Sequence, residues 1–103
     1  MASPNLPQWR LPAGISRGLW DYVHADHIAD DYDDYFSHNR LFDFDEQIVL
    51  SHVHARQLRD GVAADLGCGT GRAIVALARC GMRGLAIDLS HAMLAIVRNK
   101  ADQ

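Results

Sequence analysis

The chain has 103 residues, which is one domain at most, and its 49% hydrophobic and 22% charged residues are typical of a globular protein. The net charge of −3, with arginines scattered along the chain, argues against a nucleic-acid backbone as the main partner. No apolar run reaches the ~18 residues of a membrane span. The first twenty residues also lack the continuous apolar segment of a signal peptide. We therefore expect a cytoplasmic protein without a nucleic-acid or membrane partner.

The N-terminal part of the chain divides into a proline-containing stretch and a helical one. All three prolines lie in residues 1–15, where no apolar period can be counted, so a flexible N-terminal arm is predicted there. From residue 16, apolar residues recur at steps of three and four opposite acidic ones, which predicts an amphipathic helical segment interrupted at residues 37–40. Its tyrosines are candidates for contact with a ligand, with packing in the core as the alternative: Tyr22, Tyr32 and Tyr35.

A second helical stretch comes after the interruption. It is predicted to begin near Asp43, because Asp43 and Glu46 have the spacing of a capping box. Gly61 is its predicted stop, since glycine is favoured just after a helix. We call residues 16–60 the helical cap.

After Gly61 the pattern changes to β-α-β-α. It predicts a short buried strand, a helix, a second strand and a last helix capped by Ser90, at residues 62–66, 71–80, 84–88 and 91–99. A connection of this length through a helix predicts two parallel strands and a right-handed crossover. The predicted fold class is therefore α/β, with residues 61–103 as the β-α-β-α unit.

The first strand leads into a glycine-rich run, Asp65-Leu66-Gly67-Cys68-Gly69-Thr70-Gly71. Alternate glycines let the backbone approach a ligand, and the next helix points its free N–H groups at the same place. A dinucleotide site would have its third glycine where Arg72 stands, and its pyrophosphate would be repelled by Asp65. S-adenosylmethionine carries an ammonium and a sulfonium instead, so it is favoured. Asp88, 21 residues after Gly67, could accept the ribose hydroxyls of either ligand.

Together these residues resemble the class I S-adenosylmethionine-dependent methyltransferases. Residues 62–71 are similar to the first motif of that family, and residues 84–90, with Met93-Leu94, are similar to the acidic end of its second strand. The resemblance implies that Asp88 holds the ribose and that Leu89 packs near the adenine or ribose edge. It also implies that the methionine side of the cofactor is lined by Asp65, Gly67, Gly69 and Gly71. The helical cap resembles, less specifically, the helices that cover the cofactor in small-molecule methyltransferases, which implies a small-molecule acceptor.

The family has a seven-stranded sheet, and this chain supplies two strands. The resemblance thus implies an incomplete Rossmann-like fold, with residues 16–103 as the N-terminal portion of a methyltransferase domain and no assigned catalytic residue. We therefore do not expect these 103 residues to have methyltransferase activity alone. An open strand edge and an uncovered sheet face predict marginal stability or self-association. Two alternatives remain: a non-catalytic interaction module that pairs with another chain, and a dinucleotide-dependent oxidoreductase, which Asp65 and the early Gly71 disfavour.

Two further side-chain groups invite a functional interpretation that the sequence does not favour. Histidines and aspartates of the helical cap could place metal donors on adjacent turns, but their spacing matches no metal motif, and no metal is expected. They are His24, Asp26, His27, Asp30 and Asp31. Cys68 and Cys80 are predicted to be reduced thiols, and Cys68 lacks a neighbouring base or cation that would make it a nucleophile.

Overall fold

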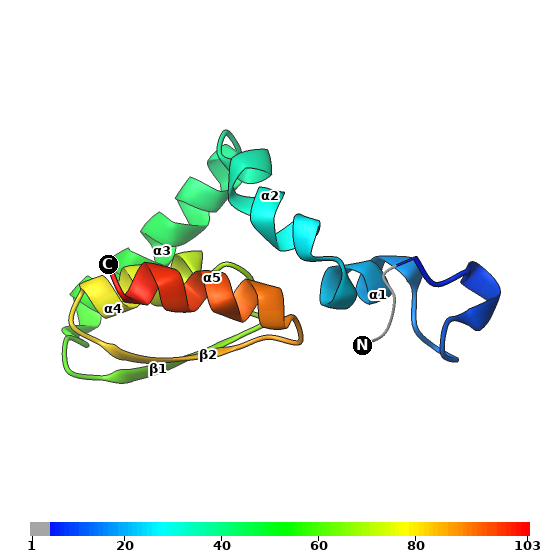
Figure 1. Ribbon diagram of the computed structural model, residues 1–103. Coiled ribbons are helices and arrows are strands. Elements are labelled where there is room, and N and C mark those ends of the chain that lie inside the picture. The colour runs from blue at the N-terminus through cyan, green and yellow to red at the C-terminus, as the bar shows by residue number, and fades with distance from the viewer. Residues whose placement is uncertain (1–4) are drawn as a thin grey trace.

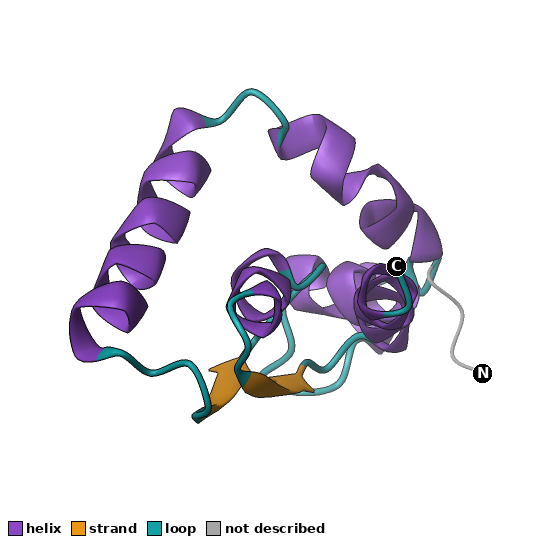
Figure 2. Ribbon diagram, turned by 90° about the vertical axis from the view of Figure 1, so that its left-hand side faces the viewer, coloured by secondary structure: helices purple, strands orange, loops and turns teal. Residues whose placement is uncertain are grey.

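The structure is a computed structural model that describes residues 5–103; residues 1–4 of the predicted arm lie outside the described part. Its elements in chain order are a short 3₁₀ helix η1 (Gln8–Arg10), α1 (Arg17–His24), α2 (Asp26–Phe36), α3 (Arg40–Arg56), β1 (Val62–Leu66), α4 (Arg72–Arg79), β2 (Arg83–Ile87) and α5 (His91–Ala101). Helices α3, α4 and α5 lie on the same side of the sheet, and α2 and α3 arch over α4 and α5 (Figures 1 and 2). Among residues 5–103, no helix combines the length and the apolar character needed to cross a membrane.

The first two helices correspond to the predicted amphipathic segment. Helix α1 begins after Ser16, whose hydroxyl accepts a hydrogen bond of 3.1 Å from the Leu19 N–H. A break that the sequence pattern did not indicate separates α1 from α2 at Ala25, which has an extended backbone with φ −98° and ψ 103°. The interruption predicted at residues 37–40 is confirmed for residues 37–39, because α2 ends at Phe36 and α3 already begins at Arg40.

Both predicted ends of the next helix are wrong. Helix α3 begins at Arg40, three residues before Asp43, because the Asn39 side chain accepts a hydrogen bond of 3.0 Å from the Leu41 N–H and is the N-cap. The helix ends at Arg56, well before Gly61. Gln57 comes next in the left-handed conformation, with φ 54°, and so takes the place at which glycine was expected.

The β-α-β-α unit is confirmed. Strands β1 and β2 are parallel, and their register pairs Val62 with Arg83 and Leu66 with Ile87. Ser90 caps α5 as predicted, since its hydroxyl accepts a hydrogen bond of 3.2 Å from the Met93 N–H. The described residues thus form a mixed α/β structure with a two-stranded parallel sheet.

The two faces of this sheet differ. On the helical side a small core is formed by Ile74, Val75 and Val97, against which Ala63 and Ala86 pack. The opposite face is apolar and open to solvent. Its exposed fractions are 61% for Val62, 77% for Leu66, 59% for Leu85 and 48% for Ile87. The prediction of a buried first strand is therefore wrong for this face, because no element of residues 5–103 covers it (Figure 2). The exposed face agrees with the expectation of an uncovered sheet face, which came from the small number of strands.

The described part is elongated. Its radius of gyration is 15.8 Å, whereas a compact domain of this length has about 13 Å. The extension comes from the N-terminal end, where α1 and residues 5–16 lie beyond the end of the sheet (Figure 1). Strands β1 and β2 end on this same side, so α1 lies next to the glycine-rich turn.

Candidate functional site

The turn from β1 into α4, residues 67–71, is here called the glycine loop. Three of its residues have left-handed backbones, with φ 71° at Gly67, 57° at Gly69 and 82° at Gly71. A Cβ at Gly71 would lie 2.8 Å from Val97 Cγ2, so this glycine also allows α4 to approach α5 closely. A Cβ at Gly67 would meet nothing within 4 Å. Gly67 therefore leaves the backbone open on a side from which a ligand could approach.

The glycine loop is fixed against the end of β2. The N–H groups of Gly67 and Cys68 both donate to the carbonyl of Ile87, at 2.8 and 3.0 Å. Helix α4 then begins at Arg72 with Gly71 as N-cap and without a side-chain cap. Its first N–H groups and the positive end of its dipole are thus available to an anionic group.

Asp88 lies against the glycine loop, directly after β2. Its Oδ2 accepts hydrogen bonds from the Gly69 N–H and from the Tyr22 hydroxyl, both at 2.8 Å, and its Oδ1 accepts one of 2.9 Å from the Ser90 N–H. Burial and the carboxylate of Asp88 raise the pKa of Tyr22, so the phenol remains protonated and acts as the donor. The candidate ribose-binding carboxylate therefore already has a partner from α1.

Asp65, unlike Asp88, has a carboxylate with no hydrogen-bond partner among residues 5–103. It is half-buried and, two residues after Ala63, lies on the helical side of the sheet. Its carboxylate makes no hydrogen bond or ion pair with any of residues 5–103. At the carboxyl end of β1, residues 5–103 therefore leave a negative charge without a partner.

The pKa of Cys68 reports the charge around the loop. Burial raises the pKa of this thiol, and the negative charges of Asp88 and Asp65 raise it further. The thiol is therefore held in its protonated form, which agrees with the prediction that Cys68 is not a nucleophile. Both carboxylates also lie close enough to the loop to make its surroundings negative.

Helix α2 is joined to the glycine loop by one hydrogen bond and to α5 by an ion pair, and Lys100 of α5 also binds the loop. Thr70 is 1% exposed, and its hydroxyl donates to Asp33 Oδ1 at 2.6 Å. Lys100 Nζ lies 2.8 Å from Asp33 Oδ2 and donates to the Thr70 carbonyl at 2.9 Å. Burial alone would raise the pKa of Asp33, but the hydrogen bonds from Lys100 and Thr70 and the charges of Lys100 and Arg72 outweigh it and lower the pKa.

Helix α3 contacts the start of α4. The guanidinium carbon of Arg72 lies 3.7 Å from the centroid of the Phe42 ring, which is a cation–π contact. Each helix of the helical cap thus touches the glycine loop, the residue after β2 or the start of α4. Sequence reasoning missed these contacts; Tyr22 was a candidate by residue type, and nothing in the spacing distinguished Asp33 or Phe42 from their neighbours.

Leu89, the predicted neighbour of the adenine or ribose, is 69% exposed. Both cysteines are free thiols. Within residues 5–103, no group of three or more His, Cys, Asp or Glu side chains is placed to hold a metal ion.

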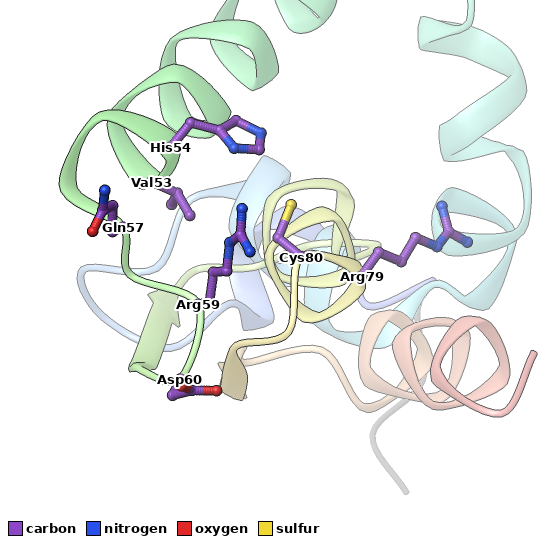
Figure 3. Close-up of a pocket in the computed structure, with 7 residues that line it drawn as sticks. All are labelled: Val53, His54, Gln57, Arg59, Asp60, Arg79 and Cys80. Carbon is purple, nitrogen blue, oxygen red and sulfur yellow. The ribbon is translucent and has the colours of Figure 1, made fainter.

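A cavity of about 810 Å³ lies elsewhere, where α3 and α4 end and before β1 begins (Figure 3). Figure 3 shows its lining, which is Val53, His54, Gln57, Arg59, Asp60, Arg79 and Cys80. None of the predicted cofactor residues belongs to it. The candidate site is therefore the glycine loop with the ends of the two strands, at the other end of the sheet.

Comparison with known proteins identifies the family that this part of the chain resembles. The family model of the methyltransferase domain matches residues 63–103, which begin inside β1 and include the glycine loop, Asp88 and α5. Searches of curated proteins and of solved structures gave no significant match. The β-α-β-α part of this chain is thus class I methyltransferase-like and corresponds to the N-terminal part of such a domain. Its two parallel strands and their helices form an incomplete Rossmann-like fold.

Proposed function

We propose that the chain binds S-adenosylmethionine at the glycine loop and serves methyl transfer to a small-molecule acceptor. The observation that carries this proposal is the carboxylate of Asp65, which has no partner among residues 5–103 and lies beside a loop that the charges of Asp65 and Asp88 make negative. A pyrophosphate would be repelled there, whereas a sulfonium and an ammonium would be attracted. Two cations close to the loop are already engaged, because Lys100 pairs with Asp33 and Arg72 lies over the Phe42 ring.

The residues present fit the parts of this cofactor. Asp65 would attract the cationic methionine part, and the uncapped start of α4 would receive its carboxylate. Gly67 leaves open space for close approach, and Gly69 and Gly71 shape the turn. Asp88 would hold the ribose, and the exposed Leu89 would cover the adenine or ribose edge.

The bound cofactor would supply a methyl group that is activated by its sulfonium. The chain itself would contribute position and exclusion of water, which account for much of the rate in a displacement of this kind. The helical cap is suited to the second task, because Asp33 and Phe42 hold α2 and α3 against the loop and the start of α4. We propose residues 16–60 as this cap and residues 61–103 as the cofactor-binding unit of one domain.

The test is a calorimetric titration with S-adenosylmethionine and S-adenosylhomocysteine. We expect binding of both by the wild type, binding weakened about tenfold in Asp65→Asn, and wild-type affinity in Asp45→Asn. The last variant makes the same chemical change at an exposed position of α3. Tighter binding of a nicotinamide dinucleotide, or equal affinities of the two asparagine variants, would contradict the proposal.

The exposed sheet face favours a second candidate function, a non-catalytic module that pairs with another chain. Four large apolar side chains are exposed together on that face, at Val62, Leu66, Leu85 and Ile87. Such a module would self-associate or bind a partner without binding the cofactor. Light scattering over a range of concentrations, combined with the titration above, separates the two functions.

A further inference from the structure

The Asp88 carboxylate already accepts three hydrogen bonds in this structure. Three donors use its two oxygens, and one of them, the Tyr22 hydroxyl, comes from a helix 66 residues away in the sequence. The other two donors are backbone N–H groups of Gly69 and Ser90, which hold the carboxylate in place. The phenol is thus the donor that occupies the position at which a hydroxyl of a ligand could bind.

We infer that Tyr22 closes the nucleoside site in the ligand-free protein, and that α1 must move off Asp88 before the ribose can bind. This inference rests on the proposed function, because it assigns to Asp88 the ribose of the cofactor. The Tyr22 hydroxyl imitates a ribose hydroxyl in chemistry and in distance, at 2.8 Å from Oδ2. It also lies over the glycine loop, 3.9 Å from where a Cβ of Gly69 would be.

Helix α1 is the part of the helical cap that can make this movement. None of its residues is fully buried, and Ala25 joins it to α2 through a single extended residue. Helix α2 is held by the Asp33 network, and α3 by the contact between Phe42 and Arg72. Loss of the hydrogen bond between Tyr22 and Asp88 would therefore release α1 while the rest of the cap remains in contact.

The closed state lowers the apparent affinity for the ligand, because only the open fraction of the molecules can bind it. When a binding-competent state holds about one tenth of the molecules, the apparent dissociation constant is about tenfold higher than that of the open state. Tyr22→Phe keeps the ring and removes the hydroxyl, so it should shift the population toward the open state. We expect about tenfold tighter binding of S-adenosylhomocysteine, equivalent to about 1.4 kcal/mol.

The experiment compares the wild type, Tyr22→Phe and Tyr35→Phe in calorimetric titrations with S-adenosylhomocysteine. Tyr35 is the matched control, because it is 80% exposed on α2 and makes a ring contact with Phe36 that phenylalanine would keep. The inference predicts tighter binding by Tyr22→Phe alone. Equal or weaker binding by Tyr22→Phe, with wild-type binding intact, overturns the inference and leaves the proposed function standing. Absence of binding by wild type and variants overturns both.

A second measurement needs no change at Tyr22. Trp20 lies in α1, two residues before Tyr22, and is partly buried, so its fluorescence and its accessibility to a quencher report on the surroundings of this helix. The exposed Trp9 is first replaced by Phe to leave one tryptophan. Saturation with S-adenosylhomocysteine should then change the Trp20 emission and its quenching by acrylamide. Unchanged emission and quenching at saturation would show that α1 stays in place, which overturns the inference.

Discussion

Two glycines of the same loop allow backbone strain to be separated from packing. Gly67 and Gly71 have similar left-handed backbones, with φ 71° and 82°, so alanine at either position costs about 1–2 kcal/mol in conformational energy. Only Gly71 is crowded, because its Cβ would lie 2.8 Å from Val97 Cγ2 and 3.2 Å from Val97 Cγ1. Overpacking of this kind costs a further ~1–3 kcal/mol. We therefore expect Gly71→Ala to lose about 2–5 kcal/mol of unfolding free energy and Gly67→Ala about 1–2 kcal/mol.

The assay is urea denaturation monitored by circular dichroism, with Val97→Ala as the relieving change. In a double-mutant cycle, Val97→Ala should recover part of the free energy lost in Gly71→Ala and none of that lost in Gly67→Ala. Binding provides an independent readout, because Gly67 faces open space and is proposed to line the cofactor. Gly67→Ala should weaken S-adenosylhomocysteine binding even under conditions in which the variant is fully folded. Equal losses of unfolding free energy in Gly67→Ala and Gly71→Ala would refute the packing argument. Additive free-energy changes for Gly71→Ala and Val97→Ala would also refute it.

Two other predictions concern the acid stability of the cap and the open sheet face. The pKa of Asp33 is lowered in the folded chain from its usual 3.8, so its contribution to stability is present above about pH 3.8 and is lost as the pH falls through the folded-state pKa. Because its side chain is 42% exposed, we expect this contribution to be about 1 kcal/mol or less. The urea midpoint of the wild type should fall more steeply between pH 5 and pH 2 than that of Asp33→Asn. Parallel curves for the two proteins would contradict a stabilising role of the Asp33 carboxylate. Leu85→Lys places a charge in the middle of the exposed sheet face, so light scattering should show less self-association at unchanged stability, and a wild type that is monomeric at every concentration would remove the basis for this prediction.

Local signals were sufficient to predict the β-α-β-α unit. The apolar run before the glycines, the glycine at the start of α4 and the Ser90 cap each act within a few residues, so their structural consequences can be read along the chain. The parallel pairing was predictable from the helix between the strands. The ends of α3 were mispredicted for a related reason. Asp43 and Asn39 are both good caps, and the hydrogen bond from the Leu41 N–H decides in favour of Asn39.

The contacts between the helical cap and the loop could not be predicted in this way. Asp33 is one of several acids on α2, and its partners Thr70 and Lys100 lie 37 residues or more further along the chain. Which acid of α2 pairs with Thr70 and Lys100 depends on how α2 crosses α5 and the loop. The spacing of residues along the sequence does not give this crossing. The exposure of one face of β1 was expected from the small number of strands, and it did not follow from the apolar pattern of the strand itself. An apolar strand predicts burial, but within residues 5–103 only one face of β1 meets other elements.

The two carboxylates of the site are expected to respond differently to removal of their charge, and the response of Asp65 shows whether it serves binding or stability. Asp88 has three donors, so removing its charge would damage both folding and binding. Asp65 has no partner among the described residues, and a half-buried charge without a partner costs stability. Asp65→Asn should therefore leave the ligand-free chain as stable as the wild type, or more stable by about 0.5–1 kcal/mol.

The same substitution should weaken cofactor binding, because the carboxylate would attract the cationic part of the ligand. At about 6 Å and an effective dielectric constant of about 20, two unit charges gain about 3 kcal/mol. Partial exposure of Asp65 reduces this to about 1.4 kcal/mol, which is the tenfold loss expected in the titration. Urea denaturation and calorimetry of one protein sample measure both quantities. A loss of stability with no loss of affinity would make Asp65 a structural residue, and the preference of this loop for a cationic nucleoside would then have no basis.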